Sequence, residues 1–259
     1  MKVKDVMSRR LITIDVDRSI HDAIKLMKRK KVSRLLVKDK DEIIGIITER
    51  DIARRLGYWK ERKLLTTHIY VSSAYTKDLK TVDEDENVSK ASRMMLTFGI
   101  SSLVVTKGKK VTGIVTKTDL IKLLKDKKIP VSSVMKKPLT IPLGSTLLQA
   151  RKIMMERGIK RLPVMYGNKL VGIVTEGDIA RALTSFRKFV EDKHLDKRMK
   201  EIKVDDVMSR NLITISEKTS VGEASNLMIK NDISCLPVMR NDELVGIVTK
   251  TDLVEVLTK

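Results

Sequence analysis

G-I-I-T-E-R-D at Gly45–Asp51 returns as G-I-V-T-K-T-D at Gly113–Asp119, as G-I-V-T-E-G-D at Gly172–Asp178 and again as G-I-V-T-K-T-D at Gly246–Asp252. Recurrence of this kind marks a repeat architecture. The chain is therefore one small unit used four times, and we expect its functional residues at equivalent positions of each unit.

Outward from the first copy, the sequence predicts a unit of the order β-α-β-β-α. Apolar residues at helical spacing follow Asp17 and Ser19, either of which can cap the helix. Two apolar runs separated by a polar turn predict a strand hairpin. The expected elements are a strand at 11–14, a helix from Ile20, strands at 35–37 and 43–47, and a helix from Thr48 that Gly57 ends.

We expect the repeats to span residues 1–62, 63–128, 129–187 and 204–259, with a charged helical linker at 188–203. A unit of about 55 residues has too small a core to be stable alone. We therefore expect the first repeat to pair with the second, and the third with the fourth, through their sheets.

Composition narrows the class of protein. The 259 residues are 42% hydrophobic and 33% charged, as in ordinary globular domains. The single cysteine, Cys235, excludes an intrachain disulfide framework and is expected to be a buried, inert thiol. We see no secretory signal and no run of roughly 20 apolar residues that could cross a membrane, so a cytoplasmic protein is expected. The single glutamine and the many Lys, Arg, Ile and Val residues favour a thermophile.

Three further features recur with the heptapeptide and resemble the CBS domain. They are a Val-Met opening at Val6-Met7, Val134-Met135 and Val207-Met208, the amphipathic helix, and an I-x-x-L-P-V strand at 159–164 and 233–238. Two such domains form a CBS pair, or Bateman module. Four resemble the γ subunit of AMP-activated kinase and stand-alone archaeal CBS proteins. The resemblance implies an α/β fold in which two CBS pairs form a flat, disc-like module.

The resemblance also implies a non-enzymatic sensor of AMP, ADP, ATP or S-adenosylmethionine, bound in clefts between paired repeats. By motif position, the aspartates would bind ribose hydroxyls, and the threonines would contact phosphate or ribose. The aspartates are Asp51, Asp119, Asp178 and Asp252, and the threonines are Thr48, Thr116, Thr175 and Thr249.

Physical chemistry is compatible with these roles and with a simpler one. A carboxylate accepts hydrogen bonds from two hydroxyls, and the free N–H groups of a helix start favour phosphate. Alternatively, the threonine is a helix cap and the aspartate a first-turn charge. Capping alone does not predict the same aspartate in four copies.

Other candidate residues distinguish the copies. Arg34 and Arg161 precede the inner strand where the family often faces ligand phosphates, whereas Ser102 and Cys235 take this position in the second and fourth repeats. These arginines could also be ordinary surface charges. Thr13, Thr140 and Thr214 could offer backbone contacts to a base, or could reflect β-propensity alone.

The second repeat departs most from the pattern. It opens with I-Y-V-S-S-A-Y at 69–75 and then carries the acidic run 83–86. The acidic run would repel a phosphate, or it complements the dipole of the following helix.

The net charge of +20 suggests a partner. Residues 204–259 hold six Lys and Arg against nine Asp and Glu, so the whole excess lies in residues 1–203. Structured RNA or a ribosomal surface would suit a basic protein with only 3% aromatic residues. With such a partner the protein could be a translational silencer. The alternatives are a nucleotide-sensing regulator of a kinase or metabolic enzyme with no nucleic-acid role, a homodimer, and an assembly module with empty clefts. The basic clusters are 28–31, 54–55, 62–63, 107–110, 125–128, 187–188 and 197–200.

Enzymatic chemistry has no sequence support. The histidines His21, His68 and His194 lack metal-ligand spacing, and no phosphate loop, dinucleotide fingerprint or nucleophile elbow occurs. We expect neither catalysis nor a metal. Methionines at 94, 95, 154 and 155 are expected to fill the core.

Overall fold

The computed structural model describes residues 1–56, 68–188 and 201–258, and the side chains up to residue 185 in the middle range. Four three-stranded sheets repeat the predicted order, each with a parallel outer pair and an antiparallel hairpin. The strands of the first and second repeats are β1(Thr13–Asp15), β2(Arg34–Asp39), β3(Glu42–Thr48), β4(Thr81–Asp83), β5(Ser102–Lys107) and β6(Lys110–Thr116). Those of the third and fourth are β7(Ile141–Pro142), β8(Arg161–Tyr166), β9(Lys169–Thr175), β10(Ile215–Ser216), β11(Cys235–Arg240) and β12(Glu243–Thr249).

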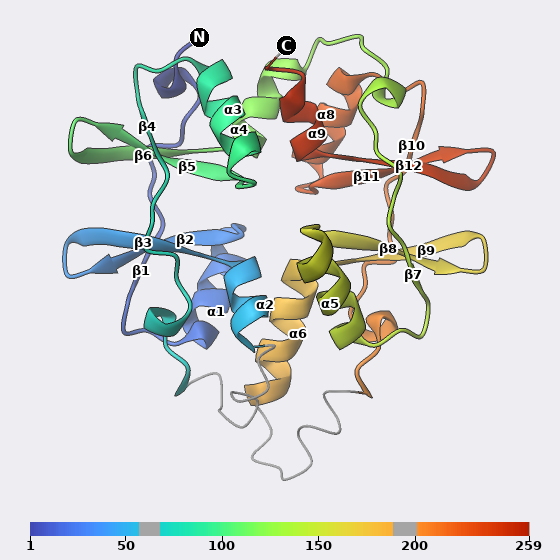
Figure 1. Cartoon of the computed structure of the whole chain (residues 1–259), viewed down its shortest axis with the longest axis horizontal. Coiled ribbons are helices and arrows are strands. Elements are labelled where there is room, and N and C mark those ends of the chain that lie inside the picture. The colour runs from blue at the N-terminus through green and yellow to red at the C-terminus, as the bar shows by residue number, and fades with distance from the viewer. Residues whose placement is uncertain (57–67, 189–200, 259) are drawn as a thin grey trace. The chain divides into compact units, whose positions relative to one another are not determined.

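Helices cover one face of each sheet (Figure 1). Ser19 caps α1 by accepting a hydrogen bond from the Asp22 N–H, as one of the two predicted caps. Gly158 ends α5 in the left-handed conformation that favours glycine. The helices are α1(Ile20–Lys30), α2(Glu49–Leu56), α3(Val88–Thr97), α4(Lys117–Ile121), α5(Leu147–Arg157), α6(Glu176–Lys188), α8(Val221–Lys230) and α9(Lys250–Glu255).

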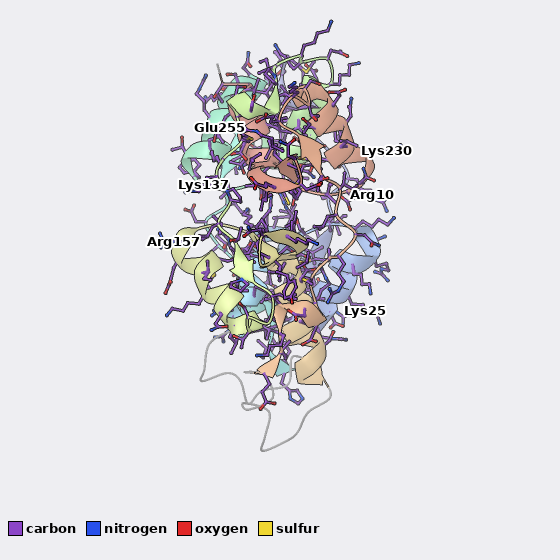
Figure 2. All side chains as sticks on the ribbon, turned by 90° about the vertical axis from the view of Figure 1, so that its right-hand side faces the viewer. Arg10, Lys25, Lys137, Arg157, Lys230 and Glu255 are labelled. Carbon is purple, nitrogen blue, oxygen red and sulfur yellow. The ribbon has the colours of Figure 1, made fainter. Side chains whose placement is uncertain are left out.

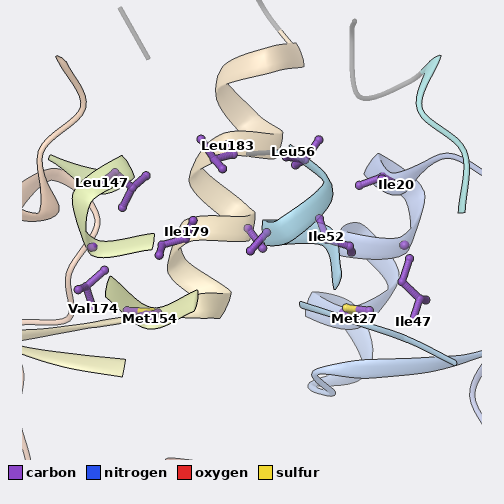
Figure 3. Packing of buried hydrophobic residues seen from close by; sticks show 14 of the residues in the cluster. Ile20, Met27, Ile47, Ile52, Leu56, Leu147, Met154, Val174, Ile179 and Leu183 are labelled. Carbon is purple, nitrogen blue, oxygen red and sulfur yellow. The ribbon is translucent and has the colours of Figure 1, made fainter. Parts of the chain in front are cut away.

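Two compact units divide these elements. One, the 1+3 unit, comprises Ile12–Asp78 and Leu139–Leu212, and the other, the 2+4 unit, comprises Met1–Leu11, Leu79–Pro138 and Ile213–Lys259. In the 1+3 unit, α2 packs against α6, and Ile52 and Leu56 face Ile179 and Leu183 across a buried core (Figure 3). In the 2+4 unit, α4 packs against α9. The expected pairing of repeats 1 with 2 and 3 with 4 through their sheets stays a prediction.

The opening segment of each repeat packs on another repeat. Val3 of the first repeat is fully buried in the core of the second, and Ser8 and Ile114 exchange backbone hydrogen bonds of 2.9 Å. Thr76 of the second repeat bridges to Ile46 of the first in return. Lys136 likewise bridges to Ile247, and Ser209 to Ile173. Repeats 1 and 2 therefore exchange opening segments, as do repeats 3 and 4.

These segments form short 3-10 helices, which are η1(Val3–Asp5), η4(Val71–Ser73), η6(Val131–Ser133) and η7(Val204–Asp206). A further 3-10 helix, η5(Lys122–Leu124), follows α4. The second repeat's divergent opening adopts the same form as the others, with Val71 fully buried. Tyr75 takes the place of the motif methionine beside Gly45. The sequence departure therefore changes a side chain and keeps the fold.

The acidic run 83–86 does not serve as a helix start, which corrects that expectation. α3 begins later, is capped by Asn87, and has no acidic residue in its first turn. Asp85 instead binds the ammonium groups of Lys2 at 3.0 Å and Lys4 at 2.7 Å. These hydrogen bonds, led by that of Lys4, lower the pKa of Asp85 to about 2. The run holds the exchanged N-terminal segment.

Two of the four methionines expected in the core are buried there, since Met95 and Met154 are at most 1% exposed, whereas Met94 and Met155 are only partly buried. Cys235 is buried as expected. Several expectations lie outside the described residues: the end of the first-repeat helix at Gly57, most of the linker 188–203, and the clusters 62–63 and 197–200. No helix in the described ranges is long and apolar enough to cross a membrane.

Candidate functional site

The motif threonine and aspartate form a reciprocal helix cap in every repeat. In the first, the N–H and Oγ1–H of Thr48 donate to Oδ2 of Asp51 at 2.9 and 2.7 Å, and the Asp51 N–H returns a bond to Thr48 Oγ1 at 3.3 Å. The same bonds join Thr116 to Asp119, Thr175 to Asp178 and Thr249 to Asp252. Capping thus uses one carboxylate oxygen and leaves Oδ1 for another partner.

The strand register brings the other predicted residues to this corner. Arg34 lies opposite Thr48, and Arg161 lies opposite Thr175. Ser102 and Cys235 occupy the same place opposite Thr116 and Thr249. The corners of repeats 1 and 3 therefore each combine an arginine, a hydroxyl and a carboxylate within one hairpin and the helix that follows it.

The three predicted base contacts lie apart from the motif. Thr13 is in β1, on the far side of β2, opposite Leu36. Thr140 and Thr214 are exposed residues immediately before β7 and β10. Thr81 in β4 holds the same register as Thr13, since it pairs with Val104, and is a fourth equivalent that sequence reasoning missed.

Free amides at the helix starts are fewer than the sequence suggested. The N–H of Glu49 donates to the Ser33 carbonyl oxygen at 3.2 Å, and that of Asp51 is bound to its threonine. The first helical amide is satisfied in the same way in the other repeats, by Ser101, Lys160 and Ser234. These N–H groups are therefore not free to bind a phosphate, and the expected phosphate contact at the helix start stays a prediction. No residue-type signal could reveal this, because any backbone carbonyl can accept the bond.

The repeats differ in the partner of Oδ1, the carboxylate oxygen of the motif aspartate that the helix cap does not use. Oδ1 of Asp119 binds Lys122 at 3.0 Å, Oδ1 of Asp178 binds Arg181 at 2.6 Å, and Oδ1 of Asp252 binds Lys136 at 2.9 Å. Lys136 also reaches Glu255 at 2.9 Å, and these two hydrogen bonds raise its pKa. Oδ1 of Asp51 has no hydrogen bond or ion pair within the described part of the chain. Sequence reasoning missed these cations, although Lys122 and Arg181 stand three residues after their aspartates.

Residues between the motif threonine and aspartate join the repeats within each unit. In the 1+3 unit, Glu49 pairs with Arg181 at 2.9 Å and Glu176 pairs with Arg50 at 2.5 Å. Burial raises the pKa of both glutamates, and the facing arginines oppose that shift. In the 2+4 unit, Lys117 and Lys250 donate to Thr251 and Thr118 at 3.0 and 2.8 Å.

No group of three or more His, Cys, Asp or Glu residues in the described ranges is placed to hold a metal ion. The corners therefore offer hydrogen-bond acceptors, hydroxyls and arginines. This donor set suits a ligand with vicinal hydroxyls and an anionic group.

Comparison with known proteins agrees with the repeat structure. A family model described as the CBS domain matches residues 3–58, 71–126, 131–185 and 204–259. Protein MJ1225 of Methanocaldococcus jannaschii is 25% identical over 98% of this chain and 97% of its own length. A 33.4 kDa protein in the ribosomal RNA operon of Thermofilum pendens is 28% identical over 90% of this chain and 83% of its own.

Solved structures show the same fold. The crystal structure of MJ1225, described as a candidate archaeal homologue of g-AMPK, has a TM-score of 0.84 at 23% identity and covers 99% of both chains. A conserved protein from Pyrococcus horikoshii has a TM-score of 0.65 at 24% identity and covers 99% of this chain and all of its own. At these identities the likeness concerns the fold alone.

Proposed function

The chain belongs to the CBS domain family, and from that premise we propose that it is a non-enzymatic regulatory protein that binds an adenosine-containing ligand of the AMP, ADP or ATP class. The observation that carries the proposal is the motif corner, built four times with one carboxylate oxygen fixed by the cap. Ribose hydroxyls donate to the remaining oxygen of the aspartate. The threonines Thr48, Thr116, Thr175 and Thr249 hold that aspartate in place.

The arginines favour an anionic ligand in two repeats. Arg34 and Arg161 each lie opposite the motif threonine, so a phosphate group attached to the ribose meets a guanidinium there. Ser102 and Cys235 provide no such charge in the other two repeats. The proposal therefore expects fewer than four equivalent sites.

Calorimetry on the full chain tests the proposal. AMP, ADP, ATP and S-adenosylmethionine are titrated separately, with GMP as a control that has the same ribose and phosphate and another base. We expect at least one adenosine compound to bind with a dissociation constant below about 1 mM, roughly 4 kcal/mol of binding free energy. If none of the four adenosine compounds binds, the proposal is wrong, and an assembly module with empty clefts is the remaining explanation.

A polyanionic partner, structured RNA or a ribosomal surface, is a second candidate that charge favours. Exposed basic side chains gather at the last turn of α1, at the β5–β6 hairpin and after η5, and residues such as Lys25, Lys137 and Arg157 project from the surface (Figure 2). The Thermofilum pendens relative is described by its place in a ribosomal RNA operon. In this proposal the nucleotide adjusts the affinity for RNA.

Co-sedimentation with ribosomes or structured RNA at increasing salt tests the second candidate. Contacts to phosphates release counterions, so the logarithm of affinity should fall by about 0.7 to 0.9 per contact for each tenfold rise in salt. Binding that ignores salt, or none at low salt, favours instead a protein partner such as a kinase or a metabolic enzyme.

A further inference from the structure

α2 and α6 begin with nearly identical sequences, E-R-D-I-A-R at 49–54 and E-G-D-I-A-R at 176–181. They differ at one position, which is Arg50 in the first repeat and Gly177 in the third. Both helices lie in the 1+3 unit and pack against each other. One substitution therefore distinguishes two otherwise equivalent corners.

Arg50 forms an ion pair with Glu176 of the opposite helix, α6. Its Nε donates to Glu176 Oε1 at 2.5 Å, and its guanidinium also lies 3.4 Å from the carbonyl oxygens of Gly158 and Ile159. The Glu176 side chain is only 9% exposed, and Arg50 is its hydrogen-bonded ion-pair partner, with Lys160 and Arg161 also acting on its charge. Arg54, three residues after Asp51, is exposed and has no ion pair within the described residues.

Because Gly177 has no side chain, Glu49 of α2 is free to pair with Arg181. A Cβ at Gly177 would lie 2.6 Å from Glu49 Oε2, so Glu49 fills the space beside the glycine. Arg181 binds Glu49 Oε1 at 2.9 Å with one nitrogen and Asp178 Oδ1 at 2.6 Å with another. Glu49 thus anchors the arginine that covers Oδ1 of Asp178, the carboxylate oxygen that the helix cap does not use.

We propose that Asp51 is the aspartate of this unit that is open to ribose hydroxyls, that Arg181 closes Asp178, and that the Arg50/Gly177 difference selects between them. The inference rests on the proposed function and specifies which corner of the 1+3 unit binds the ligand. Arg50 holds Glu176 away from Arg54, so nothing anchors Arg54 over Asp51. A ligand at repeat 3 must first displace Arg181.

In the 2+4 unit, too, cations bind the second oxygen of the motif aspartates. Lys122 and Lys136 cover the equivalent oxygens of Asp119 and Asp252. Among the four motif aspartates, Asp51 is then the one whose second oxygen has no hydrogen bond or ion pair within the described residues, and Arg34 lies opposite the threonine of its repeat.

Titration calorimetry with AMP on full-length variants tests the selection without altering any residue of the corner. Arg50→Ala frees Glu176 to anchor Arg54 over Asp51, and we expect AMP affinity at the tightest site to fall about fivefold, the scale of a competing exposed ion pair. Arg50→Lys, which keeps a cation on Glu176, is expected to bind like the wild type. Arg54→Ala should also bind like the wild type, and adding it to Arg50→Ala should restore the affinity. Arg181→Ala should strengthen a second, weaker site.

The outcomes separate the two proposals. If the wild type binds no adenosine compound, the proposed function fails and this inference fails with it. If the wild type binds AMP but Arg50→Ala binds equally well, or Arg54→Ala does not rescue it in the double variant, the selection is wrong while the function stands. Thermal melts of each variant guard against loss of fold, and the Arg54→Ala rescue cannot arise from a merely destabilised protein.

Discussion

The glycine of each G-I-V-T-x-x-D copy makes room for a side chain from another repeat. A Cβ at Gly113 would lie 2.8 Å from the sulfur of Met7 and 2.8 Å from the Ser8 carbonyl oxygen. Met208 stands in the same way beside Gly172, Met135 beside Gly246 and Tyr75 beside Gly45. The motif and the Val-Met opening therefore occur together because they touch across the exchanged segment.

Gly222 of α8 offers a test of close packing between repeats 2 and 4. A side chain there would overlap the Lys125 carbonyl oxygen and come within 2.9 Å of its carbon, and backbone cannot move aside as a flexible side chain can. We expect Gly222→Ala to lower the free energy of unfolding by about 1–3 kcal/mol, despite alanine's better helix propensity. Denaturant unfolding measures this, with Asn226→Ala at an exposed position of the same helix as control. Equal or greater stability of Gly222→Ala would contradict the packing.

The buried glutamates predict how stability depends on pH. Burial raises the pKa of Glu49 and Glu176 above that of the unfolded chain, so the folded state binds protons more readily. These two glutamates therefore stabilise the folded state most at pH below their unfolded pKa near 4.5. That stabilisation is lost as the pH rises through their higher pKa in the folded state. Between pH 7 and pH 5 the wild type should gain stability relative to Glu49→Gln/Glu176→Gln in thermal melts. Parallel pH profiles of the two proteins would refute this.

Among the helices and strands, the exchanged opening segments tie sequence neighbours together. Residues 1–11 belong to the 2+4 unit, where Val3 is buried in the core and Asp85 binds Lys2 and Lys4 at the surface. Sequence periodicity predicted the elements well, because β-α-β-β-α alternation and the Ser19 cap are local properties. It could not predict the exchange, because which repeat a segment packs on depends on non-local contacts.

The exchange makes a prediction about one buried residue. Val3→Ala leaves a small cavity in the core that Val3 shares with Val82 and Val88, and should lower the free energy of unfolding by roughly 1–3 kcal/mol. Hydrogen exchange by mass spectrometry should show faster exchange in β6, whose Ile114 amide binds Ser8, and unchanged exchange in β3. Arg10→Ala, at an exposed position of the same segment, is the matched control. Faster exchange in β3 instead of β6 would show that the segment packs on its own repeat.

At the scale of the whole molecule, four repeats share two cores, and each core joins repeats that are not adjacent in the chain. The number of repeats, the fold class and the motif residues follow from the sequence, since the heptapeptide and its flanks recur. The difference between the four motif corners does not follow from the sequence, because it depends on which cation binds the second oxygen of each motif aspartate. Arg181, for example, closes Asp178 only because Gly177 leaves Glu49 free to hold it.

The central claim is that an adenosine ligand binds at the motif corners, first at Asp51. A crystal structure of the full chain grown with AMP tests it most directly. We predict ribose hydroxyls within about 3 Å of Asp51 Oδ1, the phosphate on the Arg34 side of the corner, and Arg181 still on Asp178 at sub-saturating ligand. AMP bound away from all four motif aspartates, or bound at Asp178 while the Asp51 corner stays empty, would contradict the account.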